Sequence, residues 1–222
     1  MKMIYFFSDS HFEKHCGAQL YRQLPETLRS RMVFTENEWD ILEKGDWEKD
    51  CELLILNMIG TTCAQPHPGS GAEAAVKRYI ERGGNVLMLH GSSAAFWQWQ
   101  WWRAVSGFRW VRPGDPDEVE RSVHPVRTFT TTVAKSRHPL IGKLQEFTLE
   151  NDEIYIKCEQ TLPMTVLMET NTDEGIYPQC VECINPYGGK QIIFLPGHRV
   201  ESFENAEFIA NNIALIEYLL CK

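Results

Sequence analysis

The feature that most constrains the fold is a set of short apolar runs, each followed at once by small or polar residues. Four such runs lie at residues 3–7, 53–56, 86–89 and 191–195. Runs that are apolar at every position are typical of strands buried on both faces, in a parallel sheet covered by helices. We therefore expect an α/β fold with a doubly wound, mostly parallel sheet.

Helical patterns lie between and after these runs. Ser70 and Glu73 have the spacing of a capping box, which predicts a helix that begins there and ends at Gly83-Gly84. A second helix closes the chain, because apolar residues recur there at spacings of four, three and four. These residues are Ile209, Ile213, Ile216 and Leu220.

The second half of the chain has a different pattern. Residues 126–133 form a threonine-rich strand pattern, and residues 185–189 look like the turn of a hairpin between residues 180–184 and 191–195. An antiparallel extension therefore joins the parallel core. No linker is long enough to divide the chain, so we expect a single domain over residues 1–222.

Charge and hydropathy exclude several classes of partner. With 30 acidic against 22 basic residues, the net charge is −8, which disfavours nucleic acid and anionic membranes because both need a basic face. The longest purely apolar run, residues 3–7, is far shorter than a membrane helix, and nothing resembles a signal peptide. We expect a cytoplasmic protein.

The seven cysteines are scattered over the whole chain, which favours free and mostly buried thiols. Cys180 and Cys183 form a single CxxC motif within an alternating, strand-like stretch. Positions three apart on a strand point to opposite faces, so this pair is not expected to bind zinc or to form a redox site.

Polar side chains follow the predicted strands where ligands bind in open α/β sheets, beyond the carboxyl ends. Asp9, His11, Asn57, His90 and His198 all lie at or just past such ends. Together they would form a mixed acid–base or metal-binding set. The alternative is that they point into separate loops and never meet.

The densest polar stretch of the second half contains Asp152, Glu153 and Tyr155. On a strand, Glu153 and Tyr155 share one face while Asp152 points away. A carboxylate beside a phenol can serve as a general base or orient a sugar hydroxyl. The alternative is a solvated turn that leads into a strand.

Four of the seven tryptophans lie within residues 97–102. If this segment is helical, one of its aromatic faces enters the core and the other needs a partner, either a sugar or a second subunit. Trp97 follows His90 closely enough to flank a disaccharide-sized ligand. Trp101 and Trp102 are expected to pack against the core or another subunit.

Several short motifs occur together in one order, and with them the chain resembles the ThuA-like (trehalose utilisation) family. That resemblance implies a fold similar to class I glutamine amidotransferases. The motifs are Leu89-His90-Gly91, Gly107-Phe108, His124-Pro125, His138-Pro139, residues 152–155, residues 188–194 and Gly197-His198.

The resemblance does not imply the amidotransferase reaction, because the residues that carry out that reaction are absent. The turn Leu89-His90-Gly91-Ser92 has no nucleophilic cysteine, and Arg199 and Val200 follow His198 where a His-x-Glu pair would place a glutamate. Thioester chemistry needs that thiolate and its base, so we do not expect a glutaminase. The resemblance instead implies disaccharides or keto-sugars as substrates.

The leading hypothesis is an enzyme that acts on a sugar or keto-sugar at the strand ends. His90 and His198 would exchange protons with the substrate near neutral pH, assisted by Glu153. The remaining site residues would bind the sugar: Asp9, His11, Asn57, Ser92, Trp97, Asp152 and Tyr155.

Two other hypotheses remain open. His11, His90, His198 and Glu153 could hold a divalent metal such as zinc for hydrolysis or isomerisation, although no close sequence spacing fixes any pair. Alternatively, the chain is a non-catalytic sugar-binding or scaffold module. No cofactor is firmly implied. The expected partner is a small-molecule sugar, with no nucleic acid or membrane, and a homo-oligomer is a further option.

Overall fold

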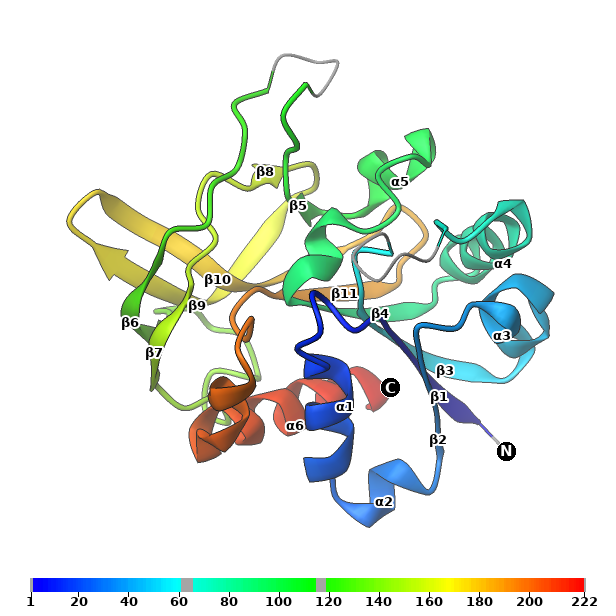
Figure 1. The fold of residues 1–222 in the computed structure, drawn as a ribbon, viewed down its shortest axis with the longest axis horizontal. Coiled ribbons are helices and arrows are strands. Elements are labelled where there is room, and N and C mark those ends of the chain that lie inside the picture. Colours follow the sequence, from blue (N-terminus) through cyan, green and yellow to red (C-terminus); the bar gives the residue numbers. More distant parts are fainter. Residues whose placement is uncertain (1, 61–65, 115–118, 222) are drawn as a thin grey trace.

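The computed structural model describes residues 2–60, 66–114 and 119–221. Its main feature is a nine-stranded mixed sheet with the strand order β2-β1-β3-β4-β11-β10-β9-β6-β7. Figure 1 shows helices packed around the β2-to-β11 part, with the remaining strands extending to the other side. The expected α/β class and the combination of a parallel core with an antiparallel extension are both confirmed.

The parallel half contains the four strands predicted from the apolar runs and one further edge strand. Parallel pairing joins β1 to β2, β1 to β3, β3 to β4 and β4 to β11. The edge strand β2 was not predicted, because only its first residue is buried and its sequence carries no continuous apolar run. The bounds are β1 Met3–Ser8, β2 Met32–Glu36, β3 Cys51–Asn57, β4 Asn85–Leu89 and β11 Lys190–Phe194.

The antiparallel half begins with the predicted hairpin, in which Ile184 pairs with Lys190. The threonine-rich stretch forms β6, as expected, and pairs with both β7 and β9. A small separate sheet joins β5 to β8. The bounds are β5 Phe108–Arg109, β6 Val126–Val133, β7 Phe147–Glu153, β8 Glu159–Gln160, β9 Met164–Thr172 and β10 Gly175–Ile184.

Helices cover both faces of the parallel half because alternate strand residues supply two separate cores. Ile4 and Phe6 enter the core beneath α1 and α6, whereas Tyr5 and Phe7 enter the core beneath α3, α4 and α5. The α-helices are α1 Cys16–Gln23, α2 Glu26–Arg29, α3 Asp40–Lys44, α4 Ser70–Glu81, α5 Gln100–Val105 and α6 Ala206–Leu220. Short 3-10 turns are η1 Asp46–Lys49, η2 His90–Ala94 and η3 Val200–Glu204.

The helix predicted from residue 70 is present as α4, but its cap differs from the predicted capping box. Ser70 is already helical, so the N-cap residue is Gly69, which has no side chain that could accept a hydrogen bond. Glu43 from α3 caps the helix instead, accepting hydrogen bonds from the amides of Gly69 and Ala72. Glu73 is drawn away to accept a bond from the Trp101 indole at 2.8 Å. A carboxylate distant in sequence has replaced the local one.

The tryptophan-rich segment is not one helix. A turn separates η2 from α5, and Phe96 within it has a left-handed φ of 55°. Trp102 is buried, as expected, while Trp97 is 52% exposed. The turn therefore removes Trp97 from the helical face on which a continuous helix would place it beside Trp101.

The described cysteines are free, in agreement with the sequence, and four of the six are buried. Cys180 and Cys183 belong to the two different cores and therefore lie on opposite faces of the sheet. Cys63 lies outside the described residues. Within the described part of the chain, no helix has both the length and the apolar character needed to cross a membrane.

Candidate functional site

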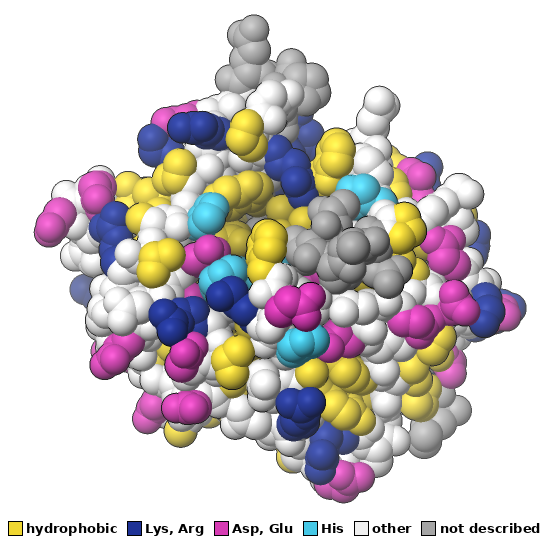
Figure 2. Space-filling view, in the orientation of Figure 1, with side chains coloured by type: hydrophobic (Ala, Val, Ile, Leu, Met, Phe, Trp, Pro, Cys, Tyr) yellow, Lys and Arg dark blue, Asp and Glu magenta, His cyan; other side chains and the backbone are white. Residues whose placement is uncertain are grey.

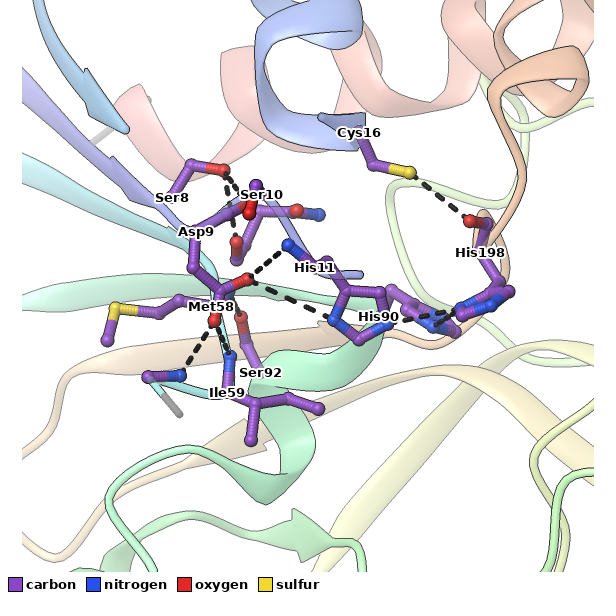
Figure 3. Close-up of polar contacts among 12 residues, drawn as sticks. Ser8, Asp9, Ser10, His11, Cys16, Met58, Ile59, His90, Ser92 and His198 are labelled. Atoms are coloured by element: carbon purple, nitrogen blue, oxygen red, sulfur yellow. Dashed lines mark hydrogen bonds and ion pairs between the residues drawn. The ribbon is translucent and has the colours of Figure 1, made fainter. Parts of the chain in front are cut away.

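Three histidines from separate strand ends meet above the parallel half of the sheet. His11 follows β1, His90 follows β4 and His198 follows β11. One ring nitrogen from each lies within 4.8 Å of the other two. Figure 3 shows the rings of His11 and His198 lying close to one another, with His90 beside them. The expected convergence at the strand ends therefore holds for these three residues.

The backbone before α1 is shaped to turn His11 inward. His11, Phe12 and Glu13 have successive φ values of 43°, 57° and 62°. Left-handed backbone costs roughly 1–2 kcal/mol per non-glycine residue, so the surrounding structure must hold it in place. Asp9 does so, because one carboxylate oxygen accepts from the His11 amide at 3.1 Å and the other from the amides of Ile59 and Gly60, both at 2.8 Å.

His90 is held in a single tautomer. Its φ of 46° places the ring at a sharp turn immediately after β4. Nδ1 lies 2.8 Å from the Leu195 carbonyl oxygen, which can only accept, so this nitrogen carries the proton. The neutral ring then presents Nε2 to the site as a bare lone pair.

Gly91 provides the space that the His11 ring occupies. A Cβ at this position would lie 2.8 Å from Cε1 of His11 and 2.9 Å from Cγ1 of Ile59. Both distances are shorter than ordinary van der Waals contact. The glycine after His90 is therefore required for close packing of the two imidazoles rather than for an unusual backbone angle.

His198 is positioned by Asp152, which lies behind the site. Oδ1 of Asp152 accepts from the amide of His198 at 3.0 Å and from the amide of Glu153 at 2.6 Å. Ser202 donates to the other oxygen of the same carboxylate. Asp152 is 1% exposed, so this carboxylate orients its neighbours and does not reach a ligand.

Glu153 brings a carboxylate against the histidines. Its Oε2 lies 3.4 Å from Nδ1 of His198 and 3.6 Å from Nε2 of His90, while Oε1 lies 3.1 Å from Nδ1 of His124. The hydroxyl of Tyr155 lies 3.3 Å from Nε2 of His90. Glu153 and Tyr155 thus share one face, as predicted, and neither belongs to a solvated turn.

Burial has the largest effect on the pKa values of the histidines in the site. It lowers the pKa of His11 to about 4, that of His198 to about 3, and that of His90 well below its usual value. Burial also raises the pKa of Glu153, although His124 opposes that change. The prediction that His90 and His198 titrate near neutral pH is therefore wrong, because imidazoles desolvated beside one another resist protonation.

Not every close contact between the three neutral imidazole rings can be a hydrogen bond. Nδ1 of His198 lies 3.1 Å from Nε2 of His11 and 3.0 Å from Nε2 of His90. Since the proton of His90 is committed to Leu195, a hydrogen bond can form across only one of these two contacts. The other brings two nitrogens about 3 Å apart with no proton between them. The Tyr155 hydroxyl, 3.3 Å away, can donate to Nε2 of His90, and a cation is the other species that these lone pairs can accept.

A cavity of about 170 Å³ opens onto two of the three histidines, whereas His90 does not line it. His11, His198, Glu153 and Tyr155 line it. Asp9 and Ser92, in contrast, are fully buried, and Ser92 accepts from the Met58 amide. The predicted sugar-binding roles of Asp9, Ser92 and Asp152 do not fit these positions, because their side chains are committed to holding loops.

Asn57 and Trp97 are also displaced from the expected site. The backbone carbonyl of Asn57 accepts from Ser8 and Asp9, and its side chain is 6% exposed and outside the cavity wall. Trp97 lines a neighbouring aromatic cavity instead. Strand-end position alone did not distinguish residues that face the ligand from those that support the loops.

Further cavity residues were not predicted from the sequence. Phe12 and Ile59 follow strand ends but are apolar, Ala94 belongs to η2, and His124 carries the His-Pro motif of the family pattern. The ring centroids of Trp110 and Tyr155 are 4.6 Å apart, and Trp110 forms one wall of the cavity. The additional lining residues are Phe12, Ile59, Ala94, Trp110, Arg112 and His124.

Fold and site together define an α/β protein with an imidazole-rich site at the carboxyl ends of its parallel strands. The family model for ThuA, described as trehalose utilisation, matches residues 6–218. The chain belongs to this family. None of the curated proteins compared with it gives a significant match.

Solved structures show the same fold at low sequence identity. A thua-like protein from Parabacteroides merdae ATCC 43184 aligns with a TM-score of 0.71 at 12% identity, covering 100% of this chain and 91% of that one. The corresponding protein from Bacteroides uniformis ATCC 8492 gives 0.70 at 15% identity, covering 99% and 91%. A β-galactosidase from Rahnella sp. R3 gives 0.61 at 10% identity, and the match covers 99% of this chain but 31% of that enzyme.

Proposed function

We propose that this protein is a divalent-metal-dependent enzyme that acts on a sugar or keto-sugar. The observation that carries the proposal is the set of three neutral imidazoles whose ring nitrogens converge within 4.8 Å, with one close nitrogen pair that no proton bridges. Catalytic zinc sites commonly use three protein ligands, at about 2.0–2.1 Å for histidine nitrogen. In a tetrahedron these lengths place the nitrogens about 3.3 Å apart. Two of the three pairs lie at 3.0 and 3.1 Å, and all three lie within 4.8 Å.

The surroundings of the rings support the same role. Metal-bound histidines usually donate their other N–H to a carbonyl or carboxylate, which fixes the ring and its tautomer. The Nδ1–H of His90 meets this pattern at the Leu195 carbonyl. Since burial keeps the rings neutral, their lone pairs are available at neutral pH without competition from protons.

In this proposal the metal would polarise a carbonyl or hydroxyl oxygen of the sugar. Glu153 would exchange a proton with the group beside that oxygen, and its raised pKa makes a carboxylate better matched to proton transfer. His124 orients Glu153 through the contact with Oε1. Tyr155 lies in the cavity wall, where its hydroxyl can meet a sugar oxygen. Isomerisation and hydrolysis are the reactions this arrangement suits.

The strand order also supports a flavodoxin-like arrangement of the parallel strands. In chain order the parallel strands lie as 2-1-3-4-5, the order of flavodoxin-like sheets, whose ligands bind at the carboxyl ends of the strands. We infer that the protein has this doubly wound arrangement, with His90 at the turn where an amidotransferase of the same architecture carries its cysteine. In this proposal an imidazole takes the place of that cysteine.

Elemental analysis tests the metal. Protein purified without chelator or affinity tag should carry about one equivalent of a divalent metal per chain. We expect His198→Asn to lose metal affinity by about a hundredfold or more. His15→Asn is the matched control, because it removes a half-exposed imidazole outside the site, and asparagine tolerates the left-handed φ of 53° at that position. Substoichiometric metal in the wild type, or equal loss in both variants, would overturn the proposal.

A second variant separates metal binding from proton transfer. Glu153→Gln keeps the shape of the side chain but cannot accept a proton. We expect metal content to stay at one equivalent while turnover of a keto-disaccharide falls by about 10²–10⁴. Loss of metal in Glu153→Gln would instead make Glu153 a ligand. Sugar binding without turnover in the metal-loaded wild type would favour a binding module.

A further inference from the structure

We propose that the aromatic cavity beside the histidine site is a second subsite, which binds the other ring of a disaccharide. The cavity measures about 300 Å³. Its walls include Trp97, Trp99, Trp102 and Trp110. The choice of a sugar as occupant rests on the proposed function, whereas the existence of the subsite rests on the geometry alone.

The two cavities adjoin one another. Ala94 and Trp110 line both of them, so one small side chain and one indole form the boundary. A ligand that extends past this boundary would therefore occupy both cavities. Figure 2 shows hydrophobic side chains gathered in a hollow on this face, with histidine and Lys or Arg side chains at its border.

Ser93 supplies a polar group that has no partner among the described residues. Its side chain is in the wall of the aromatic cavity, it is 4% exposed, and its hydroxyl makes no hydrogen bond there. The Ser93 carbonyl accepts from the Trp110 amide at 3.0 Å, which fixes the residue in position. A buried hydroxyl without a partner costs free energy that a hydroxylated ligand can recover.

Arg112 lies at the junction of the two cavities. It lines the histidine cavity, its guanidinium is 5.0 Å from the centroid of the Trp97 ring, and it donates to the Ala94 carbonyl at 3.3 Å. Its Nε is buried and has no partner among the residues that the structure describes. A donor in this position suits the oxygen that links two sugar rings or a hydroxyl next to it.

The combination of groups favours a sugar ring over a purely apolar group. Indole faces offer broad apolar area to the C–H face of a pyranose. A few polar groups placed in an otherwise aromatic wall give orientation and specificity in small-molecule sites. In the aromatic cavity the Ser93 hydroxyl, which has no partner among the described residues, is such a group, and Gln100, Arg103 and Arg109 are the other polar residues of its wall. Arg112, which lines the histidine cavity, adds a donor at the boundary.

Titration calorimetry with disaccharides and glucose tests the subsite. Trehalose, maltose and cellobiose are compared with glucose on metal-free and metal-loaded protein. We expect at least one disaccharide to bind at least tenfold more tightly than glucose. Trp97→Ala should weaken the binding of that disaccharide at least tenfold, and Ser93→Ala should weaken it about threefold or more. Both variants should bind glucose as the wild type does.

Tyr187→Ala is the matched control, because Tyr187 is also about half exposed but lies on the β10–β11 turn, at the opposite end of the strands. It should leave every affinity unchanged. If no disaccharide binds more tightly than glucose, or if Trp97→Ala and Tyr187→Ala behave alike, the subsite is wrong. Tighter binding of an aryl glucoside than of every disaccharide would assign the cavity to an apolar group and overturn the sugar assignment.

These outcomes are separate from those for the metal. Disaccharide discrimination that persists in metal-free protein supports the subsite even if the metal proposal fails. Stoichiometric metal together with equal affinities for glucose and disaccharides would leave the metal site intact and reject the second subsite.

Discussion

Replacing Gly91 by alanine should disrupt the histidine site without removing a polar group. The added Cβ would lie 2.8 Å from Cε1 of His11 and 3.2 Å from its Nδ1. Ordinary contact begins near 3.4 Å, so the His11 ring must move by about 0.6 Å or the backbone must yield. Ile59 would also be too close, because its Cγ1 would lie 2.9 Å from the added Cβ.

The expected effect on metal binding follows from this displacement. Metal–nitrogen distances tolerate only about ±0.2 Å, so a shift of this size would take His11 out of range of the proposed ion. We expect the metal affinity of Gly91→Ala to fall by about 10–100-fold, the usual result of disturbing the support of a ligand. Overpacking should also lower the free energy of unfolding by about 1–3 kcal/mol.

Calorimetric titration of metal into chelator-treated protein measures the first effect, and urea denaturation of the metal-free form measures the second. Gly142→Ala is the control, because nothing lies within 4 Å of a Cβ at that position and its φ is ordinary. We expect it to match the wild type in both assays. If Gly91→Ala binds metal as tightly as Gly142→Ala, the packing argument for His11 is refuted.

Two further predictions concern the cores. Trp102→Ala should lower the free energy of unfolding by about 3–5 kcal/mol in urea denaturation, because the ring is 3% exposed and its loss leaves a cavity; a change below 1 kcal/mol would contradict this. In native protein at pH 8, iodoacetamide should label exposed Cys221 but neither Cys16 nor Cys51, whose thiol pKa values burial raises to about 12. Mass spectrometry of labelled peptides checks this, and rapid native labelling of either buried thiol would show that its core opens.

The fold was largely predictable because its signals are local. Uninterrupted apolar runs indicated strands buried on both faces, and the structure forms β1, β3, β4 and β11 from them. The edge strand β2 carried no such signal, since most of its residues are only partly buried. The cap of α4 was mispredicted because Glu43, from another helix, took the place that the local Glu73 would have filled.

The sequence alone also determined that histidines follow three strand ends, since parallel strands bring their carboxyl ends to one edge. What only the tertiary structure decided is which polar residues face the ligand. Asp9 has the same strand-end signature as His11 and His198, yet its carboxylate accepts backbone amides. Asp152, predicted from its polar stretch, does the same. The direction in which each side chain points depends on hydrogen-bond partners distant in sequence and on left-handed backbone angles. Neither follows from the spacing of residues along the chain.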